Sequence, residues 1–131
     1  MVGIVIVSHS AEVAEGTKKL AQQMTPPELP LAAAGGTRDG RLGTDTTLIQ
    51  EAIESVAGPD GVVVLADLGS AVLSTEMALE LLPAEVRERV VLADAPLVEG
   101  AVAAAVESSL GKSLLEVKAA AEAARNLSKV S

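Results

Sequence analysis

Three side chains that can transfer a proton or bind an ion lie at the ends of apolar runs in this chain. His9, the only histidine, follows GIVIV at residues 3–7; Asp67 ends VVVLAD; Asp94 follows RVVLA at residues 89–93. Continuous apolar runs of this kind are typical of buried strands in parallel sheets. Because ligands bind beyond the carboxyl ends of strands in open α/β sheets, we expect these side chains in one cleft.

A lone histidine excludes several kinds of site. Zinc needs three or four suitable ligands, whereas this chain has one histidine and no cysteine. It has no G-x-S-x-G elbow of a hydrolase, no P-loop motif, and no Rossmann spacing in the glycine-rich residues 35–43. A receiver domain phosphorylated on Asp67 would need an acidic pair after its first strand, where this chain has Ser8, His9 and Ser10. We expect neither a metal nor another cofactor.

What remains is histidine acting as a nucleophile toward phosphorus. Imidazole has an ordinary pKa of about 6.5, so at pH 7 a ring nitrogen is free to attack, and the phosphoramidate formed can pass the group on. Asp67 would accept a hydrogen bond from the second ring nitrogen and fix the tautomer. The helix starts after His9 and Ser70 would stabilise phosphoryl oxygens. We leave Asp94 out of this site, because two carboxylates would repel a dianion.

Each of these features also has a purely structural interpretation. A histidine between two serines at a helix start is often a capping or solvent-facing residue, and Asp67 is equally typical of a helix cap or turn. The segment TRDGRL at residues 37–42, with Arg38 and Arg41, is either a solvated connection or a contact for phosphate or a partner. These alternatives stay open at this point.

The elements that must position these residues alternate along the chain. Strands are predicted at Gly3–Val7, Leu29–Ala34, Val62–Asp67 and Arg89–Ala93, the second weakly because it contains Pro30 and several alanines. Helices are predicted from Ala11 to about Met24, from Asp45 or Thr46 to Val56, from just after Ser70 to Leu82, from Leu97 to Leu110, and from Leu114 to about Leu127. This alternation predicts an α/β fold: an open, mainly parallel sheet of four or five strands with helices on both faces.

The composition predicts one domain, residues 1–131, built without aromatic side chains. The chain is 49% hydrophobic and 0% aromatic, so its core must consist of Val, Leu, Ile and Ala. We expect Met24 and Met77, which lie at helical core spacing, to pack in that core.

The charge and the missing cysteines restrict partners and location. A formal net charge of −8 with scattered basic residues argues against nucleic acid, and leaves two interpretations open: simple solubility, or a basic protein partner. The apolar run at residues 2–7 is too short for a membrane span or a signal-peptide core. The absence of cysteine fits a reducing compartment, so we expect a cytoplasmic protein without membrane contact.

Five segments carry a resemblance to a known family. They are IVIVSHS at residues 4–10, GTD at 43–45, EAIESV at 51–56, DLGSAVLSTEMALELL at 67–82 and APLVEGA at 95–101. In this order they look like the phosphotransferase subunits of phosphoenolpyruvate-dependent dihydroxyacetone kinases, whose first domain is similar to mannose-family EIIA domains. The resemblance covers essentially the whole chain.

The resemblance implies a phosphohistidine relay. His9 would take a phosphoryl group from the phosphocarrier protein HPr and pass it to ADP on the ADP-binding kinase subunit, which phosphorylates dihydroxyacetone. Asp67 would orient His9. The family also implies a homodimer and, because this chain ends at Ser131, a donor that is a separate molecule. The predicted rim of the site, to which we add the helix-capping Ser10, consists of Ser10, Gly36, Thr44, Asp45, Gly69 and Ser70.

Two other functions fit the same sequence. The chain resembles the IIA domain of a mannose-family sugar transporter, and it also fits a non-catalytic regulatory module that binds a phosphate-bearing ligand or a partner. Transfer of a phosphoryl group from a competent donor to His9 would separate a relay from a module.

Overall fold

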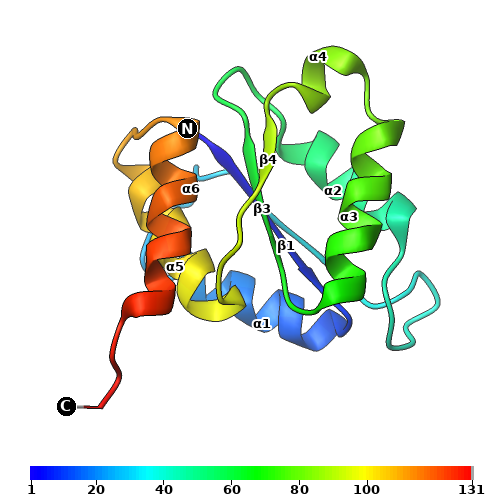
Figure 1. The fold of residues 1–131 in the computed structure, drawn as a ribbon, viewed down its shortest axis with the longest axis horizontal. Helices are drawn as coiled ribbons and strands as arrows, with labels where there is room; N and C mark the ends of the chain where they lie inside the picture. Colours follow the sequence, from blue (N-terminus) through cyan, green and yellow to red (C-terminus); the bar gives the residue numbers. More distant parts are fainter. Residues whose placement is uncertain (131) are drawn as a thin grey trace.

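A four-stranded parallel sheet, in the order β2-β1-β3-β4, forms the centre of the computed structural model, which describes residues 1–130 (Figure 1). The strands are β1 (Gly3–Ser8), β2 (Leu31–Gly35), β3 (Val62–Ala66) and β4 (Val90–Leu92). The helices are α1 (Ala11–Gln22), α2 (Thr46–Val56), α3 (Gly69–Leu81), α4 (Ala84–Arg87), α5 (Leu97–Ser109) and α6 (Leu114–Ala123), with a 3₁₀ turn at Ala124–Asn126. The predicted α/β fold with an open parallel sheet is confirmed.

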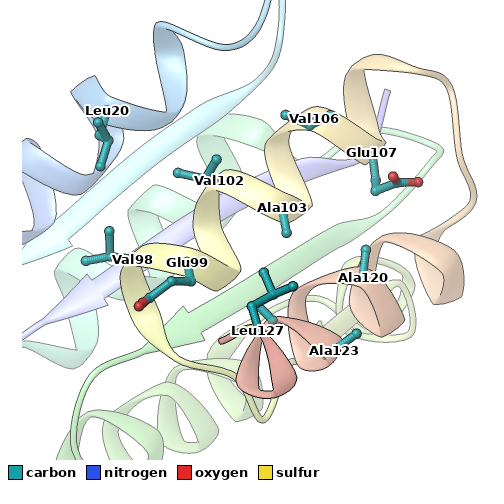
Figure 2. Close-up of a pocket in the computed structure, with 11 residues that line it drawn as sticks. Leu20, Val98, Glu99, Val102, Ala103, Val106, Glu107, Ala120, Ala123 and Leu127 are labelled. Atoms are coloured by element: carbon teal, nitrogen blue, oxygen red, sulfur yellow. The ribbon is translucent and has the colours of Figure 1, made fainter. Parts of the chain in front are cut away.

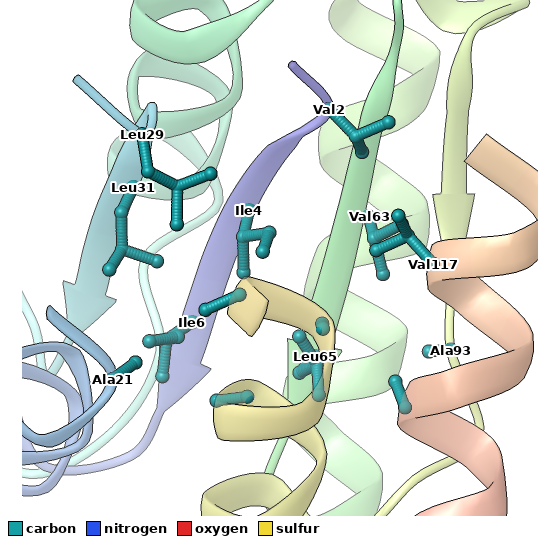
Figure 3. Close-up of a cluster of buried hydrophobic side chains, with 14 of the residues drawn as sticks. Val2, Ile4, Ile6, Ala21, Leu29, Leu31, Val63, Leu65, Ala93 and Val117 are labelled. Carbon is teal, nitrogen blue, oxygen red and sulfur yellow. The ribbon is translucent and has the colours of Figure 1, made fainter. Parts of the chain in front are cut away.

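The two central strands, β1 and β3, are continuous apolar runs because helices cover both faces of the sheet. On one face Ile4, Ile6 and Leu65 pack against α1, α5 and α6, as Figure 3 shows. On the other face Val5 and Val7 pack against α2 and α3. Because all four strands are parallel, their carboxyl ends lie at one edge of the sheet.

Small residues line the helix faces that contact the sheet, so the helices approach it closely. A Cβ atom added at Gly100 in α5, for example, would lie 2.9 Å from a methyl carbon of Leu65. The larger side chains of these segments point outward: Met24, just after α1, is 58% exposed, and Met77 in α3 is 59% exposed. The prediction that both methionines pack in the core is therefore wrong. The buried residues are instead Ala14, Thr17 and Ala21 in α1, and Ala71, Thr75 and Ala78 in α3.

Several element ends differ from the prediction for local reasons. Strand β2 begins at Leu31 because Pro30 has no N–H to donate, although its carbonyl still accepts from Ile4 at 2.9 Å. The four-residue helix α4 was not predicted, because one turn is too short to show a periodic pattern. Helix α6 gives way to the 3₁₀ turn after Ala123. Within residues 1–130, no helix has the length and apolar character needed to cross a membrane.

The loop between β2 and α2 provides a test of backbone strain. Gly36 and Gly40 both have positive φ, +69° and +86°, but a Cβ at Gly36 would lie 2.9 Å from the Arg41 carbonyl oxygen, whereas a Cβ at Gly40 would meet nothing within 4 Å. We expect Gly40→Ala to lower the free energy of unfolding by about 1–2 kcal/mol, the ordinary cost of the left-handed region. Gly36→Ala should cost clearly more. Urea unfolding measures both, and equal losses would show that the loop relaxes around the added methyl group.

Candidate active site

His9 lies in the turn between β1 and α1 and is held by its backbone from two sides. Its N–H donates to the Asp67 carboxylate (Oδ2) at 3.0 Å, and its carbonyl oxygen accepts from the Gly43 N–H at 2.8 Å. The first bond ties His9 to the end of β3, and the second ties it to the loop that precedes α2. The position of the ring is thus set by three separate segments of the chain.

The two ring nitrogens of His9 have different partners. Nδ1 is 2.9 Å from Asp67 Oδ1, and Nε2 contacts the Ser70 hydroxyl at the start of α3. Since an ionised carboxylate only accepts hydrogen bonds, Nδ1 must carry a proton, which leaves the lone pair of the neutral ring on Nε2. The side chain is 24% exposed, so a reactant can reach it.

Asp67 is the acceptor on which this arrangement converges. Its two oxygens accept from the Ser8 hydroxyl at 2.8 Å and the Leu68 N–H at 2.7 Å, in addition to the two donors of His9. Burial raises the pKa of Asp67, but the hydrogen bonds of His9, Ser8 and Leu68 outweigh burial and hold the pKa below its ordinary value of 3.8. The carboxylate is therefore ionised at neutral pH.

Ser8 is a site residue that the sequence analysis did not single out. It is the last residue of β1, it is 1% exposed, and its hydroxyl accepts from the Ser10 N–H at 3.0 Å while donating to Asp67. The available signal was its place in the chain: a hydroxyl that ends a fully buried strand must find a hydrogen-bond partner. Here that partner is the carboxylate that also holds the imidazole.

Ser10 and Gly69 lie at the starts of the two helices that flank His9. The Ser10 hydroxyl caps α1 by accepting from the Val13 N–H at 3.2 Å. Gly69 is the first residue of α3, and a Cβ built there would meet nothing within 4 Å, so the space beside this helix start is open.

Gly36, Thr44 and Asp45 belong to the loop on the other side of His9. Gly36 donates its N–H to the Ser8 carbonyl at 3.1 Å, and the Thr44 hydroxyl is 2.6 Å from the Ser74 hydroxyl of α3. Asp45 caps α2 by accepting from two N–H groups of its first turn, at 3.0 and 3.2 Å. All three hold the loop in place, and their role at the rim of a phosphate site stays a prediction.

Asp94 lies at the same edge of the sheet but does not join His9. Its carboxylate is 91% exposed and pairs with Arg125 at 3.1 Å. Together with Asp67 it lines a hollow of about 330 Å³ at the ends of β3 and β4, and His9 is not among the residues that line this hollow. The two arginines near the site are also engaged, Arg38 with Glu51 and Arg41 with Asp39.

The geometry supplies a nucleophile, a carboxylate that orients it, and two helix starts. Within residues 1–130 there is no group of three or more His, Cys, Asp or Glu side chains placed to hold a metal ion. The first intrahelical donor of α3 is the Ala71 N–H, so the N–H groups of Gly69 and Ser70 are available to an anion beside Nε2.

The model of the EIIA-man family, described as "PTS system fructose IIA component", matches residues 3–118. The chain belongs to the EIIA-man family.

Among curated proteins, several similar relatives are subunits of one kinase system. The chain is 42% identical over 113 residues to a Listeria innocua protein named "PEP-dependent dihydroxyacetone kinase 2, phosphoryl donor subunit DhaM", which covers 86% of this chain and 90% of the relative. It is 48% identical over 120 residues to the Escherichia coli "PEP-dependent dihydroxyacetone kinase, phosphoryl donor subunit DhaM", covering 89% of this chain. Our chain spans only 25% of that longer relative.

Solved structures show the same fold. A crystal structure described as that of "unknown function protein EF1359" has a TM-score of 0.82 and 38% identity, covering 92% of each chain. A sigma-54 interaction domain protein from Enterococcus faecalis, with a TM-score of 0.62 and 20% identity, covers 88% of this chain and 84% of its own and shares the fold alone.

The lowered pKa of Asp67 predicts a pH-dependent contribution to stability. The ionised carboxylate stabilises the folded chain above pH 3.8, and this contribution is lost as the pH falls through the lowered pKa of the folded state. We expect Asp67→Ala to cost about 1–3 kcal/mol at pH 7, because it removes the acceptor of the partly buried Ser8 and His9 donors. The difference between the free energies of unfolding of the parent chain and of Asp67→Ala, both measured with urea, should become smaller below pH 3.8. A difference that stays constant down to pH 2 would contradict this role.

Proposed function

We propose that this chain is a phosphohistidine relay protein of phosphoenolpyruvate-dependent dihydroxyacetone phosphorylation. In this proposal His9 receives a phosphoryl group from HPr and passes it to ADP on the ADP-binding kinase subunit. One observation carries it: Asp67 holds Nδ1 of His9, so that Nε2 lies at the open start of α3. The names of relatives in Listeria innocua and in Lactococcus lactis, the latter 36% identical, support the choice of substrate system.

The chemical step requires little from the protein beyond positioning. The Nε2 lone pair attacks phosphorus, the new N–P bond forms, and the bond from phosphorus to the imidazole of the donor breaks, which returns its electron pair to the donor ring. The Nδ1 proton stays in its hydrogen bond to Asp67, whose negative charge stabilises the phosphorylated, positively charged ring. Transfer to ADP then runs the same way, with a β-phosphate oxygen as the nucleophile.

The phosphoryl oxygens would be stabilised by the start of α3. The Ser70 hydroxyl contacts Nε2 in the unphosphorylated chain, and on phosphorylation it can turn to donate to an equatorial oxygen. The N–H groups of Gly69 and Ser70 add two further donors at the positive end of the helix.

Phosphorylation in a defined system tests the proposal. With phosphoenolpyruvate, enzyme I and HPr, the mass of the intact chain should increase by one phosphoryl group that is labile in acid, and His9→Ala should abolish the gain while folding normally. Asp67→Ala should be phosphorylated more slowly, because Asp67 orients the ring without bonding to phosphorus. A ³¹P spectrum should assign the group to Nε2. No mass gain with a competent donor would favour the regulatory module instead.

The acceptor of the phosphoryl group distinguishes the dihydroxyacetone system from a sugar transporter. Release of the phosphoryl group to ADP on the kinase subunit supports the dihydroxyacetone system, whereas release to a membrane sugar permease would identify the IIA domain of a mannose-family transporter. We also propose that residues 1–131 act as one phosphotransferase domain, and that they act in the cytoplasm, which the absence of cysteine supports.

We propose a homodimer formed through an apolar groove of about 630 Å³ that lies between α1, α5 and α6 (Figure 2). Leu20 and Leu127 flank it, and Val102 lies within it. Apart from Glu99 and Glu107 its lining residues are apolar, which suits burial against the same groove of a second copy.

Sedimentation of the purified chain tests this assembly. We expect a dimer, which Leu20→Glu should convert to a folded monomer by placing a charge in the groove. Leu110→Glu is the matched control, since Leu110 is exposed but lies outside the groove. A parent chain that sediments as a monomer would rule the homodimer out.

A further inference from the structure

The net negative charge of this chain comes from one segment of it. Residues 42–86 contain eight Asp or Glu and no Lys, Arg or His, so their formal charge equals the −8 of the whole chain. The remaining residues contain ten acidic and ten basic side chains. Residues 42–86 include α2 and α3, which together cover one face of the sheet (Figure 1). The segment that forms α2 and α3 therefore carries the net negative charge, although Arg38 pairs with Glu51 of α2 at 3.2 Å, and the rest of the chain is balanced.

An apolar stripe runs along α3 in this acidic segment and starts at the nucleophile. Leu73, Met77 and Leu81 follow Ser70 at spacings of three, seven and eleven residues, which places them along one side of the helix. Each of the three side chains is more than half exposed. We call these three residues the α3 ridge. Since Ser70 contacts Nε2 of His9, the ridge is continuous with the active site.

Acidic side chains frame the α3 ridge. Glu76 and Glu80 lie on the same side of the helix and are exposed, and Glu54 is exposed on the neighbouring helix α2. Within residues 1–130 none of these three forms an ion pair. An apolar centre with a charged, solvated rim is the usual anatomy of a protein–protein interface.

We propose that the α3 ridge is the docking surface for the protein that delivers the phosphoryl group to His9, and that this donor presents an apolar centre framed by Lys or Arg. The inference rests on the proposed relay function. The charge of the rim selects the partner: opposite charges steer encounter and fix register, whereas a second copy of this chain would bring acid against acid.

The active site itself also calls for a basic partner. A phosphoryl group carries negative charge and must approach His9 beside the ionised Asp67. The nearby arginines, Arg38 and Arg41, are already paired with carboxylates. Positive charge brought by the docking partner would offset this repulsion during transfer, as groups supplied in trans do in other phosphoryl transfers.

The test compares a protein donor with a small one. The second-order rate constant for phosphorylation of His9 is measured with phosphorylated HPr and with inorganic phosphoramidate, which needs no docking surface. We expect Leu73→Ser to lower the HPr rate constant about tenfold, as the loss of a central apolar contact does. The double variant Glu76→Gln/Glu80→Gln should lower it as well and weaken its dependence on ionic strength. Rates with phosphoramidate should not change.

Matched controls lie on the opposite edge of the molecule. Leu110 is as exposed as Leu73, and Glu28 is an exposed acid before β2, so Leu110→Ser and Glu28→Gln should leave the HPr rate constant unchanged. Unaltered HPr rate constants in both Leu73→Ser and Glu76→Gln/Glu80→Gln would overturn the docking surface and leave the proposed relay intact. A Leu73→Ser variant that dissociates a dimer but is phosphorylated normally would also overturn it, by assigning the ridge to self-association. Failure of HPr to phosphorylate even the parent chain would refute the proposed donor and the docking surface together.

Discussion

The carboxylate of Asp67 is the interaction on which the rest of the site depends. It stands at the end of β3 and accepts from Ser8, the last residue of the neighbouring strand β1, and from both the backbone and the ring of His9. One side chain thus joins two strand ends, satisfies a buried hydroxyl and determines that the lone pair of the neutral ring lies on Nε2, beside Ser70. A neutral group of the same shape would keep some of these contacts but not the charge that a protonated or phosphorylated ring requires.

The sequence predicts the central strands well because both faces of β1 and β3 are covered, which leaves an uninterrupted apolar run as their signature. It predicts the helix faces poorly. Size and hydropathy alone point to Met24 and Met77 as core residues, yet the sheet is contacted by alanines such as Ala14 and Ala78. In a chain without aromatic side chains, helices approach the sheet closely, and small residues are the ones that fit between them.

The sequence likewise predicts some residues of the active site and misses others. Topology brings His9 and Asp67 together, since parallel strands end at one edge, and strand order alone separates Asp94, which lies beyond β3 and pairs with Arg125. Ser8 was not predicted because its role depends on the register of β1 against β3, which decides whose side chains meet at the strand ends. Register of this kind cannot be read from one strand alone.

The hydrogen bond from the Gly43 N–H to the His9 carbonyl holds the glycine-rich loop against the active site. Thr44 connects the same loop to α3 through the Ser74 hydroxyl, and Asp45 connects it to α2 by capping that helix. This loop is therefore in place before a visiting protein arrives, and only the Ser70 hydroxyl has to turn away from Nε2. Turnover in a relay of this design is governed by how fast successive visitors arrive and leave rather than by rearrangement of the carrier.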